Sequence, residues 1–218
     1  MSVTSLATSV ILSAASALST SCEDIFLSAT KAFHRSMQIT MTSSEEGRQL
    51  ADFAHAACMT SNPDVLWRIG ATESSLRPRI ARDNDTGKIY VGHKAIVATA
   101  SALSTGRSNN IDVGILQINV RAHGKRMQDL GLYPINPYSQ VKYIVDHMMP
   151  ELTRKCGDFN WVGCYHSWSS KPRASSYQTL VKSREASLMK SIREVVRIRS
   201  EAASNKRRTP SETPRNLQ

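Results

Sequence analysis

Glu73 is the residue of this sequence whose surroundings best suit acid–base chemistry. It closes the stretch from Asn62 to Glu73, which opens with a helix-capping residue and Pro63 and then carries apolar side chains at helical spacing. We therefore predict a short helix that holds the carboxyl against apolar neighbours. Such surroundings raise the pKa of a carboxyl, so that it carries a proton near neutral pH and acts as a general acid. The alternative is a hydrated glutamate at a helix end, without a catalytic role.

Two later segments place polar residues at fixed positions within apolar runs. They are Asp112-Val-Gly-Ile-Leu-Gln-Ile-Asn119 and Asn160-Trp-Val-Gly-Cys-Tyr-His-Ser167. Gly114 allows the backbone to approach another segment closely. Taken alone, the other residues also have plain structural interpretations: Gln117 as an amide that caps a buried turn, Tyr165 as a core aromatic with a satisfied hydroxyl, and His166 as a surface histidine.

Together with Glu73-Ser74, and in this order, these segments resemble the lytic transglycosylases of the goose-type lysozyme superfamily. The Glu-Ser pair of that family matches Glu73-Ser74, and its Gly-Leu-Met-Gln motif matches Gly114-Ile-Leu-Gln117. Its Ala-Tyr-Asn motif matches Cys164-Tyr165-His166, with histidine in place of asparagine. The Tyr-His-Ser variant, and an aspartate two residues before the glycine, resemble the specialised members that serve conjugation and type IV or type III secretion machines. The resemblance covers residues 48 to 182.

The resemblance implies a mainly α, lysozyme-like (α+β) fold, in which a helical domain and a small irregular or β segment line a saccharide groove. It implies that Glu73 cleaves the MurNAc–GlcNAc β-1,4 bond of peptidoglycan with a 1,6-anhydro-muramyl product, locally opening the cell wall for a secretion or conjugation apparatus. Tyr165 would orient Glu73 by a hydrogen bond, and His166 would line the groove. The substrate-binding residues that it implies are Ser74, Gly114, Gln117, Tyr165, His166 and Tyr177.

The number of carboxylates bears on the mechanism. An ordinary glycosidase uses two carboxylates that flank the bond. Asp83 and Asp85 belong to a run typical of a turn, Asp83-Asn-Asp-Thr-Gly87, and Asp112 is the third candidate for a partner of Glu73. With Glu73 alone, the substrate's own N-acetyl group supplies the nucleophile, and the resemblance implies that Glu73 then deprotonates the muramyl 6-hydroxyl. Hydrolysis of the same bond, as by a muramidase, and a non-catalytic structural component of a secretion apparatus stay open as alternatives.

Other segments are predicted to position these residues. Ser43 and Glu46 have capping-box spacing and begin a helix, which places the start of the catalytic domain, residues 45 to 182, near this point. Further predicted elements are helices over 23–33, 94–103 and 137–154, a helix capped by Asp158, and a short strand over 88–92.

The N-terminal region has two interpretations. Residues 1–21 contain a short apolar run and a possible cleavage site, Ala15-Ser16-Ala17, but no lysine or arginine precedes the run. The segment is a secretory signal that directs the protein to the periplasm or cell envelope, or else a leader without structure, with Met37 or Met41 as later starts. Residues 22–44 form an extension of unknown role.

The four cysteines, at positions 22, 58, 156 and 164, suit either disulfides in an oxidising compartment or burial as small apolar residues. The chain has neither a Cys-x-x-Cys pair nor a His-Glu-x-x-His motif, so we expect no metal and no cofactor. A net charge of +10 favours anionic partners, which include nucleic acid, acidic lipid and peptidoglycan. No helix-turn-helix pattern supports nucleic acid as the partner.

The basic excess is concentrated near the C-terminus. Residues 183–203 form a predicted amphipathic helix with basic residues on one face and an apolar stripe on the other. This stripe consists of Leu188, Met189, Ile192, Val195 and Val196. Either the stripe packs against the domain, which we favour, or the helix docks on an anionic surface or a secretion-machine component. Residues 204–218 are predicted to be a disordered basic tail.

Overall fold

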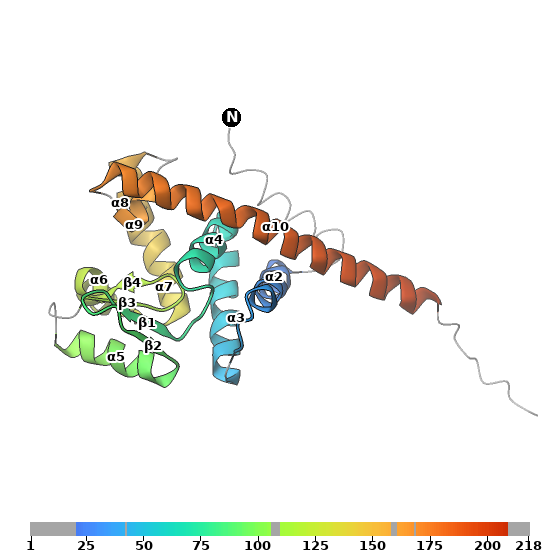
Figure 1. Cartoon of the computed structure of the whole chain (residues 1–218), viewed down its shortest axis with the longest axis horizontal. Helices are drawn as coiled ribbons and strands as arrows, with labels where there is room; N and C mark the ends of the chain where they lie inside the picture. Colours follow the sequence, from blue (N-terminus) through green and yellow to red (C-terminus); the bar gives the residue numbers. More distant parts are fainter. Residues whose placement is uncertain (1–20, 42, 106–109, 158–160, 168, 209–218) are drawn as a thin grey trace, which may run out of the picture.

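The protein is mainly helical, with a small four-stranded antiparallel sheet, in a computed structural model that describes residues 21–41, 43–105, 110–157, 161–167 and 169–208 (Figure 1). The helices are α2 (Cys22–Ser36), α3 (Ser44–Cys58), α4 (Pro63–Glu73), α5 (His93–Ser104), α6 (Val120–Asp129), α7 (Pro137–Tyr143), α8 (Met149–Cys156), α9 (Trp161–Ser167) and α10 (Lys171–Arg208). The strands are β1 (Ile80–Asp83), β2 (Ile89–Val91), β3 (Ile111–Val113) and β4 (Ile118–Asn119), in the order β2-β1-β3-β4. The predicted fold class, mainly α with a small β segment, is confirmed.

Local sequence signals explain where several of the helices begin. The side chains of Ser43, Asn119 and Asn136 accept hydrogen bonds from backbone amides in the first turns of α3, α6 and α7. Pro63 begins α4 as predicted, but the side chain of Asn62 makes no capping bond to that helix. The predicted helix over 137–154 is interrupted, because a π-helical segment, Ile144–Met148, joins α7 to α8. Asp158 lies outside the described residues.

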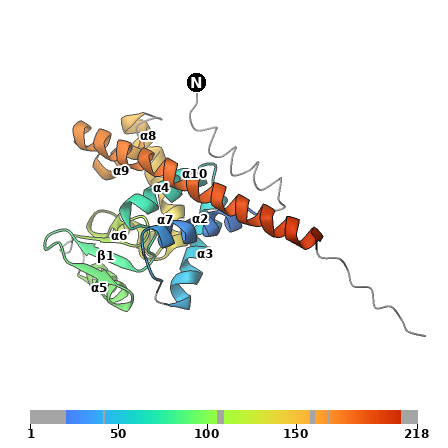
Figure 2. The same ribbon diagram turned by 45° about the vertical axis from the view of Figure 1, so that its right-hand side comes forward.

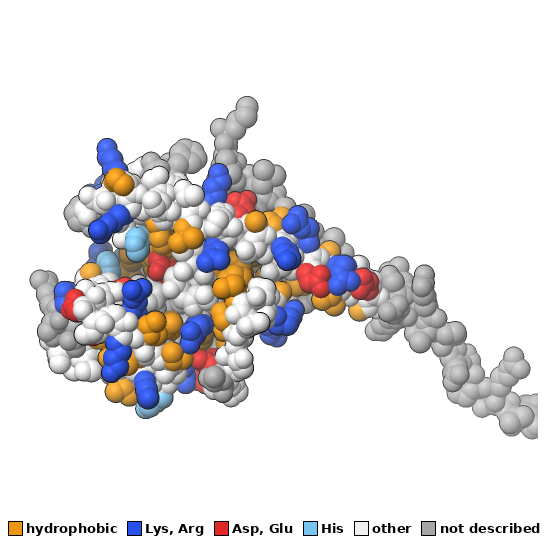
Figure 3. All heavy atoms as spheres, in the orientation of Figure 1, with side chains coloured by type: hydrophobic (Ala, Val, Ile, Leu, Met, Phe, Trp, Pro, Cys, Tyr) orange, Lys and Arg blue, Asp and Glu red, His pale blue; other side chains and the backbone are white. Residues whose placement is uncertain are grey.

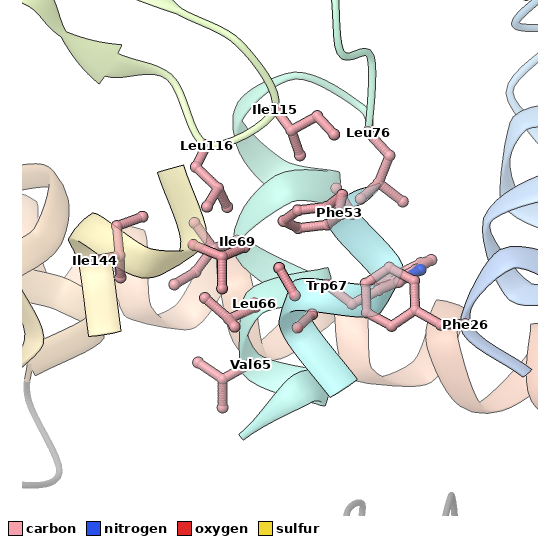
Figure 4. Close-up of a cluster of buried hydrophobic side chains, with 14 of the residues drawn as sticks. Phe26, Phe53, Val65, Leu66, Trp67, Ile69, Leu76, Ile115, Leu116 and Ile144 are labelled. Carbon is pink, nitrogen blue, oxygen red and sulfur yellow. The ribbon is translucent and has the colours of Figure 1, made fainter. Parts of the chain in front are cut away.

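Helix α4 lies at the centre of the core (Figure 4). Its Trp67 is fully buried, stacks edge-on against Phe33 of α2 and donates a hydrogen bond of 3.0 Å from Nε1 to Thr30 Oγ1. Ile69, on the same helix, is also fully buried, and Leu116 from the loop before β4 packs in the same cluster. Residues 22–36, within the extension to which the sequence assigned no role, thus form a wall of the core that supports the helix of Glu73.

Two disulfides join neighbouring helices. Cys22–Cys58 connects α2 to α3, and Cys156–Cys164 connects α8 to α9. Disulfides form and persist in oxidising compartments, so the two bonds favour an extracytoplasmic location. A search of the described residues finds no helix that is both long and apolar enough to cross a membrane. The predicted leader, residues 1–21, lies outside the described residues except for Ser21, which caps α2.

Helix α10 is much longer than the predicted segment 183–203. It runs without a break from Lys171 to Arg208, passes α9, α4 and α2, and its last turns extend beyond the rest of the molecule (Figures 1 and 2). Leu188 and Ile192 are buried within the main core cluster, and Val195 on the same helix is also buried. The prediction that the stripe packs against the domain is therefore confirmed. Residues 209–218 of the predicted tail lie outside the described residues.

We predict that Leu188→Ala lowers the free energy of unfolding by about 2–5 kcal/mol, because it leaves a cavity under α10. Ile198→Ala is the matched control, since Ile198 lies on the same helix with 47% of its surface exposed, and its loss should cost less than about 0.5 kcal/mol. Thermal and urea denaturation of both variants measure the difference. Equal stabilities would show that this stripe does not hold α10 to the domain.

Candidate active site

Glu73 lies at the end of α4 and lines a cleft of about 700 Å³. The walls come from the sheet and the start of α6 on one side, and from α9 and the first turn of α10 on the other. Other pockets are an apolar one of about 230 Å³ between the start of α4 and α8, and two more polar ones of about 510 and 410 Å³, between α2 and α10 and between α5 and α6. The cleft at Glu73 is larger than these three and contains a carboxyl with a raised pKa, so it is the candidate active site.

The electrostatics of Glu73 suit a proton donor. Burial, with a further contribution from the nearby Asp112 carboxyl, raises the pKa of Glu73 from 4.5 to about 7. The hydrogen bond from Tyr177 acts in the opposite direction and keeps the pKa from rising further. Near neutral pH the carboxyl therefore exists in both protonation states, so it can donate a proton in one step and accept one in the next.

Tyr177, and not Tyr165, holds the carboxyl of Glu73. The Tyr177 hydroxyl, from α10, donates a hydrogen bond of 2.5 Å to Glu73 Oε1. The His166 ring stacks on Tyr177 at a centroid distance of 4.8 Å and an interplanar angle of 8°, and it also lines the cleft. The Tyr165 hydroxyl donates instead to the carbonyl of Leu116. The expectation that Tyr165 orients Glu73 by a hydrogen bond is wrong, because its hydroxyl is committed to this carbonyl.

Ser74 and Gly114 build the site from behind rather than facing the cleft. The buried Ser74 hydroxyl donates to the Ile115 carbonyl at 2.8 Å, which ties the end of α4 to the loop before β4. Gly114 has φ +75°, and a Cβ there would lie 2.1 Å from Gln140 Nε2. Neither residue lines the cleft. Both support the loop and helix around the site, and the expected contact with substrate is not seen for either.

The buried amide of Gln140 holds this loop in shape. Its Nε2 donates to the carbonyls of Val113 and Pro134, at 2.7 and 2.5 Å, and its Oε1 accepts from the Leu116 amide at 3.0 Å. Gln117 follows with φ +48°, and its side-chain amide donates to the Gly114 carbonyl at 2.7 Å. Of the residues in the Gly-Ile-Leu-Gln motif, Gln117 is the one that reaches the cleft.

Asp112 is the second carboxyl in the cleft. It accepts hydrogen bonds of 2.7 Å from the side-chain amides of Asn84 and Asn119. The other two candidates lie elsewhere: Asp83 accepts from backbone amides of its own turn, as expected, and Asp85 pairs with Arg121 at 2.8 Å.

Of the ionisable side chains in the cleft, three were not singled out from the sequence: Arg82 on β1, His123 on α6 and Arg173 on α10. Nδ1 of His123 lies 3.1 Å from the hydroxyl of the buried Tyr143. Burial lowers the pKa of His123, so its ring is neutral at physiological pH and offers a hydrogen-bonding group to a ligand. The sequence contained a signal for His123, because it lies four residues, about one helical turn, after Asn119 at the end of the second motif, and both side chains line the cleft.

Comparison of the chain with protein-family models, curated proteins and solved structures finds no match. The described residues contain no group of three or more histidine, cysteine, aspartate or glutamate side chains that could hold a metal ion. The site itself is a glutamate with a raised pKa in an open cleft lined mainly with polar side chains.

We predict that Tyr177→Phe raises the pKa of Glu73 above about 7, because the lost hydrogen bond stabilises the charged carboxylate. Tyr165→Phe is the control: it removes a hydroxyl that bonds to a backbone carbonyl, so the pKa of Glu73 should change little. Titration of the Glu73 carboxyl by carbon-13 NMR measures both. A pKa that rises in the Tyr165 variant and not in the Tyr177 variant would contradict the assignment.

Proposed function

We propose that this protein is a peptidoglycan lytic transglycosylase that cleaves the MurNAc–GlcNAc β-1,4 bond. The observation that carries the proposal is the Glu73 carboxyl, which has a pKa of about 7, accepts a hydrogen bond from Tyr177 and lines a cleft of about 700 Å³. A cleft of this size is within the range of ligand sites. The mainly helical fold with a small sheet at the cleft supports the resemblance to the goose-type lysozyme superfamily.

The mechanism follows from one carboxyl that acts twice. Protonated Glu73 donates its proton to the glycosidic oxygen while the bond from that oxygen to the muramyl C1 breaks. The carbonyl oxygen of the substrate's N-acetyl group forms a bond to C1, which is the substrate-assisted route. The carboxylate of Glu73 then takes the proton of the muramyl 6-hydroxyl, whose oxygen displaces the N-acetyl oxygen from C1. The 1,6-anhydro ring closes without water, and Glu73 is protonated again.

The setting that we propose is the bacterial periplasm, where the enzyme opens the wall locally for a secretion or conjugation apparatus. The two disulfides support an oxidising compartment, which also contains the substrate. Basic side chains are scattered over the face shown in Figure 3 and mix with acidic ones on the far end of α10. This distribution supports contact with anionic polymers or surfaces, including contact through the outward face of α10, more than a dedicated nucleic-acid site.

A second candidate reaction is hydrolysis of the same bond, as by a muramidase. Asp112 favours it, because two carboxyls in one cleft are what an ordinary glycosidase requires. Asp112 is, however, already engaged by the amides of Asn84 and Asn119, an arrangement that suits a fixed charge beside Glu73. A non-catalytic role in the apparatus would not account for the raised pKa of Glu73 in the cleft.

We predict that Glu73→Gln abolishes cleavage of purified peptidoglycan, with a loss of at least about 10²- to 10⁴-fold, because an amide of the same size cannot donate an acidic proton. Mass spectrometry of released muropeptides measures the activity, and circular dichroism checks that the fold is retained. Undiminished release by this variant would refute the role of Glu73. No release by the wild-type protein would favour the non-catalytic alternative.

We predict that Asp112→Asn still releases 1,6-anhydro-muramyl products, but that its activity falls at a lower pH than in the wild type. The charge of Asp112 raises the pKa of Glu73, so its removal lowers that pKa, and the protonated acid is lost earlier as the pH rises. The pH profile and the masses of the products test both parts. Reducing-end muramyl products from the wild type, abolished in the variant, would establish hydrolysis with Asp112 as the second carboxyl.

A further inference from the structure

Two arginines line the cleft and have no partner among the described residues. Arg82 comes from β1, and Arg173 comes from the first turn of α10. Both side chains are exposed, and neither makes an ion pair or a hydrogen bond with any described residue. Other arginines beside acidic residues do form pairs, as Arg121 does with Asp85 near the same sheet.

Arg82 makes no ion pair even though an acidic residue, Asp112, lies opposite it in the sheet. Arg82 and Asp112 are directly paired in the register of β1 and β3, a position from which opposite charges commonly interact. Asp112 instead accepts hydrogen bonds from Asn84 and Asn119. These two amides occupy the carboxylate and leave the guanidinium of Arg82 available at the cleft.

Asp112 is the charged group that raises the pKa of Glu73, and neither guanidinium is among the causes of that shift, although both line the same cleft. A guanidinium forms short, paired, charge-assisted hydrogen bonds with a carboxylate, which gives both affinity and orientation. Sugar hydroxyls and N-acetyl groups are uncharged and gain much less from an arginine.

We propose that Arg82 and Arg173 form a carboxylate-binding subsite that recognises the acidic side group of muramyl residues. This inference rests on the proposed function. Every muramyl residue carries a lactyl group that ends in a carboxylate when no peptide is attached and in an amide when a stem peptide is present. The subsite therefore makes peptide-free glycan strands the preferred substrate class. A carboxylate of the stem peptide is the other source of the same chemistry.

The test measures binding to the Glu73→Gln protein, in which strands are not consumed. Three ligands are compared: glycan strands stripped of peptides by an amidase, the same strands with their lactyl carboxyls converted to neutral amides, and strands that keep their stem peptides. With stripped strands, we expect Arg82→Gln/Arg173→Gln to weaken binding at least about tenfold. With the amidated strands, the parent and the double variant should bind equally, and the parent should bind them as weakly as the double variant binds stripped strands.

Arg154→Gln/Arg193→Gln is the matched control, since both residues are exposed and neither lines the cleft. It removes the same charge and should leave binding unchanged. An effect of the double variant confined to peptide-bearing strands would assign the bound carboxylate to the stem peptide. Equal binding of all three ligands by parent and double variant would overturn the subsite. Arginine-dependent binding by a protein whose wild type cleaves no strand would uphold the subsite and refute the proposed reaction.

Discussion

The hydrogen bond from Tyr177 to Glu73 is the contact on which the rest of the site depends. It joins the end of α4 to α10 across 104 residues of sequence, and the long helix must pack on the core for the phenol to reach the carboxyl. Burial also raises the pKa of Tyr177, so that the phenol stays protonated and remains a donor. Without this donor, the part-buried carboxylate would lack the hydrogen bond that limits its desolvation cost.

The loop between β3 and β4 is fixed by several buried hydrogen bonds, although most of its residues do not line the cleft. Gln140 takes the space that a side chain at position 114 would fill, and its amide satisfies three backbone groups of the surrounding loops. A buried amide with all its partners present is rigid, because each bond lost would leave an unpaired polar group. The glycine of the motif is thus explained by packing against Gln140, and Gln117 is the part of the motif that the loop presents to the cleft.

The cleft combines opposite charges that do not cancel each other. Asn84 and Asn119 donate hydrogen bonds to Asp112, and Arg82, opposite Asp112 in the sheet, makes no ion pair with it. Cys156–Cys164 anchors α9, the helix that carries Tyr165 and His166, to α8 and so limits its movement relative to this arrangement.

Caps and apolar spacing act between neighbours in the chain, so sequence patterns were enough to predict the helix that ends at Glu73 and the inward stripe of α10. The mainly helical fold with a small sheet was predicted from the resemblance to a known family. The folded structure was needed to establish which tyrosine bonds to Glu73, which cysteines pair, and that Ser74 and Gly114 lie behind the cleft. It also decided that Asn84 and Asn119 engage Asp112 in place of Arg82. Each of these outcomes depends on the relative placement of segments far apart in the sequence, and local periodicity contains no record of that placement.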